Sequence, residues 1–171
     1  MNRHDLETPV KTTEKEDVYR LLETVKDPEL PVLSIVDLGI VRDVLRDETE
    51  NVWVIRVTPT YSGCPAMDMI ATQIRMTLYA AGITAFRIET VLSPAWTTEW
   101  MKESAKERLR AYGIAPPGRI AALLDGRPES VSCPRCGSED TTCLSEFGST
   151  ACKSLYRCEN CLEPFDHFKC H

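Results

Sequence analysis

The sequence predicts an α/β fold: a small mixed three-stranded sheet packed with helices, followed by a C-terminal module of the zinc-ribbon type. Residues 14 to 112 predict the sheet and helices, because helical and strand-like apolar patterns alternate there and include a β-α-β crossover. The cysteines predict the C-terminal module, since seven of the eight lie in the last 39 of the 171 residues. A chain of this length can bury one core of about 100 residues and carry a small second module.

The first predicted element is a helix from Glu14 to about Lys26, where Asp27-Pro28 stops it. Its apolar residues recur at helical spacing and share one face: Val18, Leu21, Leu22 and Val25. This face is expected to pack on the sheet.

A tight turn and a hairpin follow. Ser34 caps a single helical turn, Asp37 reaches back to it, and Gly39 ends it. Residues 40–47 and 52–58 are rich in strand-forming residues and are joined by four polar residues, which predicts an antiparallel hairpin. Its buried face is expected to hold Trp53, Ile55 and Val57.

A second helix is expected to open at Pro65 and to end at Gly82. Its apolar stripe consists of Met67, Ile70, Ala71, Ile74, Leu78 and Ala81. Residues 83–92 alternate between apolar and polar, which predicts a third strand after the crossover and therefore a mixed sheet. A last surface helix is expected from Ser93-Pro94 to Tyr112.

These patterns divide the chain into an α/β domain over residues 14–127 and a Cys-rich, zinc-ribbon-like domain over residues 128–171. Turn-forming residues at 125–128 mark the boundary. The aromatic residues of the tail are expected in the ribbon's own core: Tyr156, Phe165 and Phe168. Residues 1–13 are polar and aperiodic, and we expect a flexible leader there.

The composition argues against several classes of partner. The formal net charge is -6 and no cluster of Lys and Arg occurs, so nucleic acid is not expected as a ligand. The sequence contains neither a signal-type start nor about 18 consecutive apolar residues, so we expect no membrane span and a cytoplasmic location. In a reducing cytoplasm the cysteines are expected as metal ligands, reactive thiols or buried residues rather than as disulfides.

Two Cys-x-x-Cys knuckles, separated by 21 residues, predict a metal site in the tail: Cys133, Cys136, Cys158 and Cys161. Four thiolates satisfy a structural tetrahedral zinc, and its binding would supply folding free energy to a segment with little apolar content. Two alternatives stay open, namely redox-active dithiols and a tetrathiolate iron or cluster. The candidates for extra metal ligands are Cys143, Cys152, Cys170 and His171, and His167 could likewise substitute as a ligand or simply pack.

Cys64 lies 69 residues before the next cysteine, where a helix-capping residue would stand. The helix dipole and the unpaired N–H groups favour the thiolate there, and Gly63 and Pro59 suggest an accessible thiol on an irregular loop. The alternative is a small buried residue beneath the sheet. Asp27 and Glu29 form a second polar candidate, which an Asp-Pro-Glu turn also explains without function.

The segments at 27–39 (DPELPVLSIVDLG) and 58–65 (TPTYSGCP) resemble the small iron-sulfur assembly domain family, over about residues 14–112. The resemblance implies help in installing or maintaining an iron or iron-sulfur centre in a client, with iron or a cluster held transiently. It implies that Cys64 is the functional thiol. The expected neighbours of this thiol are Asp27, Glu29, Thr60, Tyr61 and Gly63.

Further segments at 93–97 (SPAWT), 113–117 (GIAPP) and 147–153 (FGSTACK) resemble the PaaD-like branch of that family, which serves phenylacetate degradation. This branch implies subunits of a multicomponent phenylacetyl-CoA 1,2-epoxidase as partners, above all its iron-sulfur reductase or its diiron component. The iron-sulfur assembly machinery and a second copy of the chain stay open as further partners, because one thiol cannot hold a cluster alone.

The sequence lacks the Glu-x-x-His ligands of a diiron oxygenase and the glycine loop of a flavin or NAD reductase. We therefore expect a non-catalytic accessory factor that matures or maintains the iron or iron-sulfur centres of the epoxidase. A non-catalytic structural subunit of the same complex is the alternative.

Overall fold

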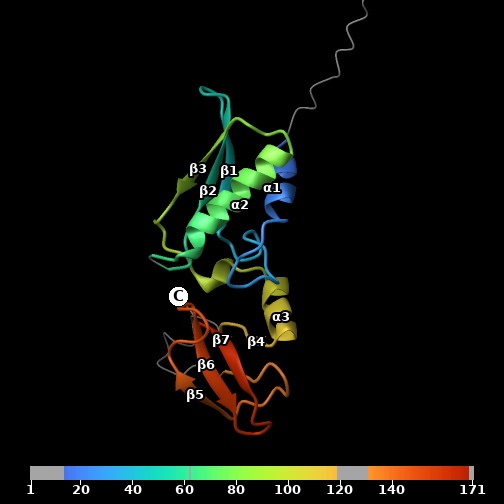
Figure 1. The fold of residues 1–171 in the computed structure, drawn as a ribbon, viewed down its shortest axis with the longest axis vertical. Helices are drawn as coiled ribbons and strands as arrows, with labels where there is room; N and C mark the ends of the chain where they lie inside the picture. Colours follow the sequence, from blue (N-terminus) through green and yellow to red (C-terminus); the bar gives the residue numbers. More distant parts are fainter. Residues whose placement is uncertain (1–13, 62, 119–130, 170–171) are drawn as a thin grey trace, which may run out of the picture.

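The computed structural model describes residues 14–61, 63–118 and 131–169 of the chain (Figure 1). The predicted leader, the predicted boundary at residue 127, Cys170 and His171 lie outside these residues. The described helices and strands follow one another in this order: α1 (Lys15–Leu22), β1 (Val41–Asp47), β2 (Val52–Val57), α2 (Ala66–Ala80), β3 (Phe86–Thr90), η1 (Thr98–Trp100), α3 (Glu103–Tyr112), β4 (Ile114–Ala115), β5 (Thr141–Ser145), β6 (Lys153–Cys158) and β7 (Pro164–Phe168).

Strands β1, β2 and β3 form the predicted mixed sheet, with β1 antiparallel and β3 parallel to β2. Helices α1 and α2 lie side by side over one face (Figure 1) and contribute these residues to the core: Val18, Leu22, Ile70, Ile74 and Leu78. The buried positions predicted for β2 are confirmed: Trp53, Ile55 and Val57. The other face carries ion pairs around Arg87, which lies 3.0 Å from the Asp47 carboxylate and 2.9 Å from that of Glu89.

Helix α1 ends at Leu22, so the prediction that it extends to about Lys26 is wrong. After the helix the chain turns and pairs with the segment that follows the Asp-Pro-Glu turn. Lys26 forms an isolated antiparallel bridge with Ser34, and the Ile35 N–H donates to the Val25 carbonyl at 3.0 Å. Val25 is still buried, which explains why the apolar spacing continues beyond the last helical residue.

The predicted capped turn at residues 34–39 is confirmed. The Asp37 N–H donates to the Ser34 hydroxyl and the Ser34 N–H donates to the Asp37 carboxylate, each at 3.0 Å. Gly39 has φ +70°, and a Cβ there would lie 2.7 Å from the Cβ and the carbonyl oxygen of Trp100, so only glycine fits. Arg108 of α3 reaches the same carboxylate at 2.8 Å and thereby fixes α3 against the turn.

The helix predicted from Ser93-Pro94 is wrong in its first half, because α3 begins only at Glu103. The preceding chain is irregular except for the short η1 turn. Trp96 is 4% exposed and its indole N–H donates to the Leu38 carbonyl at 2.9 Å. Burial of this side chain requires an extended approach to the core, so tertiary packing decides the backbone here.

The ribbon, residues 131–169, contributes three strands to a second sheet, whose strand order is β4-β7-β6-β5. Strands β5, β6 and β7 are antiparallel neighbours. The sequence patterns did not predict β4, which lies before the ribbon and pairs in parallel with β7 through Ile114 opposite Asp166 and Ala115 opposite His167. The chain segment after α3 thus belongs to the ribbon's sheet.

The two cores meet at this junction. Phe168 was expected in the ribbon's own core, but it belongs to the larger core and its ring meets the Trp96 ring edge-on, with centroids 6.1 Å apart. Cys152 is buried in the larger core as well, whereas Phe165 lies in the ribbon's core as predicted. The ribbon is therefore packed onto the α/β domain rather than tethered to it.

The length and apolar content needed to cross a bilayer are not reached by any helix within the described residues.

The Asp37 carboxylate should stabilise the fold in a pH-dependent way. Partial burial alone would raise its pKa, but hydrogen bonds from Ser34 and the Arg108 guanidinium lower the pKa of Asp37 to about 2. Because the folded value lies below the unfolded value, the stabilisation is present above about pH 4 and is lost as the pH falls towards 2. We expect Asp37→Asn to lower the unfolding free energy by about 2 kcal/mol at pH 7 and much less at pH 2.

Chemical denaturation followed by tryptophan fluorescence measures this effect, since all three tryptophans lie in the α/β domain. Asp43→Asn is the matched control, because its ion pair with Lys15 is exposed and should be worth less than about 1 kcal/mol. Equal losses for both variants, or a loss at Asp37 that does not change with pH, would contradict the assignment.

Candidate functional site

The knuckle cysteines occupy two turns of the same geometry: Cys133, Cys136, Cys158 and Cys161. In each turn the residue four positions after the first cysteine donates its N–H to that cysteine's carbonyl. Gly137 donates to Cys133 at 2.9 Å, and Leu162 donates to Cys158 at 3.0 Å. Both residues have positive φ, 76° and 64°. This turn brings the two sulfurs of each knuckle to the same side of the chain.

The four sulfurs fit a tetrahedral ion. All of them lie within 4.8 Å of one another, with 3.8 Å between Cys133 and Cys161 and 3.5 Å between Cys136 and Cys158. Metal–sulfur bonds of about 2.3 Å in a tetrahedron require sulfur separations of about 3.8 Å. The donor set is therefore suited to a structural ion with no open position.

The electrostatics of the four sulfurs also favour a cation. The Ser138 N–H lowers the pKa of Cys136 to about 6. The Glu163 N–H likewise lowers the pKa of Cys161. Desolvation and the three neighbouring sulfurs outweigh this effect and raise the pKa of Cys161 to about 12. The group cannot hold four thiolates without a compensating positive charge.

The other candidate ligands within the described residues do not join these four. Cys143 is exposed on β5, 3.9 Å from the Glu146 carboxylate. Cys152 is buried at the junction of the two cores. His167 on β7 is buried and its Nδ1 lies 3.2 Å from the Ser154 hydroxyl. In the part of the chain that the structure describes, the converging set thus contains only the four predicted sulfurs.

Cys64 lies on the loop between β2 and α2, two residues before the helix. Its N–H donates to the Tyr61 carbonyl at 3.2 Å, and its own carbonyl accepts the Met67 N–H at 3.3 Å. Pro65 takes the capping position that was expected for Cys64. A Cβ at Gly63 would meet no atom within 4 Å, so the loop is open beside the residue that precedes Cys64.

The expectation that the N-terminus of α2 lowers the pKa of Cys64 and favours its thiolate is wrong for the chain without a bound ion. Desolvation raises the pKa of Cys64, and the Glu29 and Asp27 carboxylates raise it further. The Ala66 N–H and the Tyr61 hydroxyl oppose this without cancelling it. Cys64 is therefore a part-buried thiol whose surroundings favour its protonated form, and a nearby cation would favour the thiolate instead.

Asp27 holds the Asp-Pro-Glu turn together. Its Oδ1 accepts the N–H groups of Glu29 and Leu30, each at 2.8 Å, and its carboxyl is buried. Burial raises the pKa of Asp27 against these two hydrogen bonds. These contacts favour the structural explanation of Asp27 that the sequence left open.

Glu29 links the two domains. The Cys152 thiol donates to its carboxylate at 3.2 Å, and the Lys153 ammonium donates to its backbone carbonyl at 3.3 Å. Desolvation raises the pKa of Cys152 to about 12 in spite of the Thr150 hydroxyl, and Glu29 adds to the rise. Sequence reasoning placed Glu29 and Cys152 in separate groups, because their separation of 123 positions in the sequence conceals the contact.

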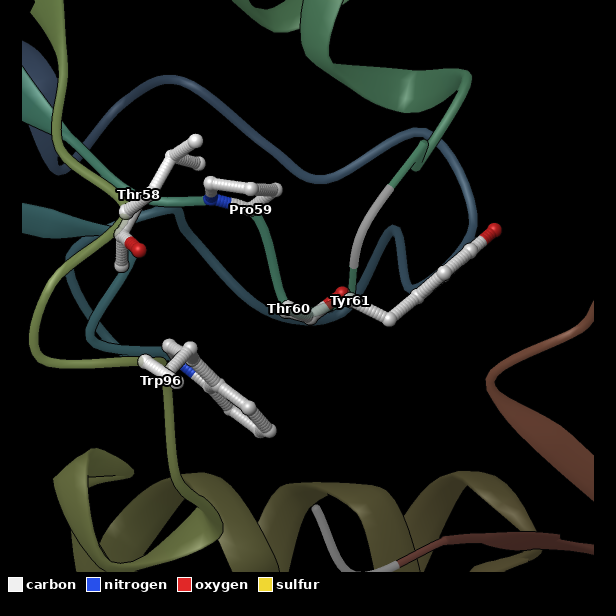
Figure 2. Close-up of a pocket in the computed structure, with 7 residues that line it drawn as sticks. Thr58, Pro59, Thr60, Tyr61 and Trp96 are labelled. Carbon is white, nitrogen blue, oxygen red and sulfur yellow. The ribbon is translucent and has the colours of Figure 1, made fainter.

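A pocket of about 270 Å³ lies beside the Cys64 loop (Figure 2). Thr58, Pro59, Thr60 and Tyr61 follow one side of it, and Trp96 faces them from the other. The lining also includes Ala95 and Leu92. Leu92 was expected within the third strand, over residues 83–92, but β3 ends at Thr90 and Leu92 is 68% exposed. Ala95 and Trp96 of this wall belong to the segment at 93–97, which was singled out from the sequence for its resemblance to the PaaD-like branch and not as part of a pocket.

Desolvation raises the pKa of Tyr61 to about 12, and the electrostatic influence of Cys64, Glu29 and Cys152 adds to the rise. Tyr61 therefore lies close enough to both thiols and to the carboxylate between the domains to respond to all three. Of the predicted neighbours, Tyr61 forms a side-chain hydrogen bond with Cys64, Glu29 acts on both electrostatically, and Thr60 lines the pocket.

Two family models match the chain. One is described as an iron-sulfur cluster assembly protein and matches residues 15–83, and the other is the PaaD zinc beta ribbon domain, at residues 120–169. Together with the four-sulfur cluster, the second match indicates metal binding in the tail. Both matches confirm the resemblance predicted from the sequence segments.

Individual relatives agree. An Escherichia coli protein named as a putative subunit of 1,2-phenylacetyl-CoA epoxidase is 52% identical and aligns over 90% of this chain and 92% of its own length. An Fe-S protein maturation auxiliary factor of Porphyromonas gingivalis is 35% identical over 61% of this chain and 93% of its own length. A domain of unknown function (DUF59) from Bacillus anthracis superposes with a TM-score of 0.51 at 36% identity, over 56% of this chain and 90% of that one, in accord with the predicted fold class.

The four-sulfur site should retain one divalent ion per chain through dialysis. We expect Cys161→Ser to lose that ion, because a structural zinc site needs all four thiolates, whereas Cys143→Ser should retain it. Metal analysis of the purified full chain measures both. Chelation should also speed amide exchange in β5, β6 and β7 while β2 stays protected, since metal binding is folding free energy for the ribbon. Retention of the ion by Cys161→Ser would contradict a tetrathiolate site.

Proposed function

The chain belongs to the PaaD family, and on that premise we propose that it is an accessory factor of a multicomponent phenylacetyl-CoA 1,2-epoxidase. In this function it helps to install or maintain an iron or iron-sulfur centre in a subunit of the epoxidase. That subunit is either the iron-sulfur reductase or the diiron component of the epoxidase. The E. coli relative bears the name of an epoxidase subunit, and the P. gingivalis relative bears that of a maturation factor.

The observation that carries the proposal is the setting of Cys64. Its part-buried thiol lies at an open loop, beside the Glu29 carboxylate and the Tyr61 hydroxyl. A protonated thiol of this kind is inert towards most partners, but a soft or borderline metal ion displaces the proton and converts it into a ligand. Cys64 can therefore hold iron transiently and release it again when it is reprotonated.

The ribbon supplies a rigid surface in this scheme. Its tetrathiolate ion, zinc in our proposal, keeps about 40 residues folded with little apolar content. The packing of Phe168 on Trp96 fixes that surface relative to the Cys64 loop. The client thus meets the ribbon and the working thiol as one unit.

A second candidate function is supported by the printed name of the E. coli relative, which describes a subunit of the epoxidase. A structural subunit would contribute an interface and no metal chemistry. It would remain in stoichiometric complex with the other subunits, and its thiol would be dispensable.

Cys64→Ser should leave the fold intact and reduce the iron content of co-expressed epoxidase subunits to the level found without this protein. The reason is that serine matches cysteine in size but is a much poorer ligand for ferrous iron. Iron analysis and the absorption of the reductase's cluster measure the effect, with Cys143→Ser as the matched control.

Unchanged iron content in the Cys64→Ser sample would contradict the maturation function. If that sample also retained a stoichiometric complex and epoxidase activity, the structural subunit would be the better description.

A further inference from the structure

Cys152 is the one described tail cysteine that leaves the ribbon and enters the core of the α/β domain. It is 1% exposed, and its thiol lies 3.2 Å from the Glu29 carboxylate and 3.0 Å from the Thr150 hydroxyl. An apolar residue of similar size would fill this space but would leave the carboxylate without its thiol donor. A thiol placed against a carboxylate is a pair of potential metal ligands.

The backbone holds Cys152 in this position. Its carbonyl accepts the Lys169 N–H at 3.0 Å, and the next residue, Lys153, donates its N–H to the Thr150 carbonyl at 3.1 Å. The Lys153 ammonium is buried and lies 3.3 Å from the Glu29 carbonyl and 3.9 Å from the Asp166 carboxylate. A positive charge is therefore fixed beside the thiol and the carboxylate.

Glu29 also faces the Cys64 loop. Its carboxylate acts electrostatically on Cys64, on Cys152 and on the Tyr61 hydroxyl, which itself contacts Cys64. Cys64 also packs against the core cluster that buries Cys152. The two thiols and the carboxylate therefore lie in one region of the junction, and they come from the Asp-Pro-Glu turn, the loop before α2 and the ribbon.

We propose that Cys64, Cys152 and Glu29 form a second metal site, across the junction of the two domains, that takes ferrous iron as cargo. The inference rests on the proposed function and supplies the additional ligands that Cys64 needs. Two thiolates and one carboxylate suit a borderline ion, and three protein ligands leave a position open for a ligand from the client. Such a site releases its ion more readily than the closed tetrathiolate does.

The geometry accommodates this ion after a small movement. Sulfur and oxygen ligands of one tetrahedral ion lie about 3.5 Å apart, close to the 3.2 Å between Cys152 and Glu29. The Cys64 sulfur does not yet converge with these two atoms as the four knuckle sulfurs converge, so it approaches when the ion binds. Gly63, with open space beside it, lets the loop make that approach.

Charge and protons balance. Binding one ferrous ion releases two thiol protons, and the resulting site of two thiolates, one carboxylate and one divalent ion carries one negative charge. The Lys153 ammonium compensates that charge. The ion neither gains nor loses an electron.

The test uses the full chain with zinc in the ribbon and titrates cobalt(II), then ferrous iron, without oxygen. We expect one further ion per chain, a sulfur-to-cobalt charge-transfer absorption and two protons released. Cys152→Ser and Glu29→Gln should each weaken binding by at least about 100-fold, since even indirect contacts to a metal can be worth 10- to 100-fold. Cys143→Ser should bind as the unaltered chain does.

Both substitutions are close in size and retain a hydrogen-bonding group, and the unfolding midpoint and zinc content verify that the fold is intact. Should Cys152→Ser prove unfolded, Glu29→Gln alone decides. Undiminished cobalt binding by folded Cys152→Ser or Glu29→Gln would overturn the site. That result would leave the proposed function standing if Cys64→Ser still lowered epoxidase iron, so the two failures are distinguishable.

Discussion

The contact between the two cores is the constraint on which the rest of the molecule depends. A ribbon of fewer than 40 described residues buries few apolar side chains of its own, so its fold gains from a supporting surface and from any ion that cross-links its four knuckle sulfurs. The parallel pairing of β4 with β7 and the contact of Phe168 with Trp96 provide that surface. The same contact determines where Cys152 lies and therefore which groups surround Glu29.

This arrangement separates two uses of cysteine that the sequence places close together. The knuckle sulfurs converge within 4.8 Å at the turns of the ribbon, where a closed set of four thiolates favours a permanent ion. Burial and the neighbouring carboxylate instead raise the pKa of Cys64 and of Cys152. Retention and transfer of metal ions need opposite ligand properties, and our proposal assigns them to these two groups of cysteines.

Local patterns predicted the elements whose residues contact near neighbours in sequence. The hairpin, the capped turn at Ser34 and helix α2 follow from alternation, capping chemistry and a helical stripe, and the structure confirms them. The knuckle spacing likewise predicted the four sulfurs that converge.

The sequence-based predictions are wrong where contacts between residues far apart in the sequence determine the structure. The burial of Trp96 against Leu38 delays α3, and a two-residue strand such as β4 has no periodicity to detect. Burial raises the pKa of Cys64, and Glu29, 35 residues before it in the sequence, raises it further, so the local argument from the helix terminus gave the opposite sign. The pairing of Glu29 with Cys152 could not be inferred from either segment alone.

The position of β4 bears on how such a tail can be exchanged between proteins. A ribbon transplanted by cutting the chain at residue 127 would leave behind Ile114 and Ala115, which form the fourth strand of its sheet. It would also carry Phe168 to a host without a tryptophan to receive it. The transferable unit therefore begins before the ribbon's first cysteine, at the end of α3, and it requires a matching aromatic side chain in its new host.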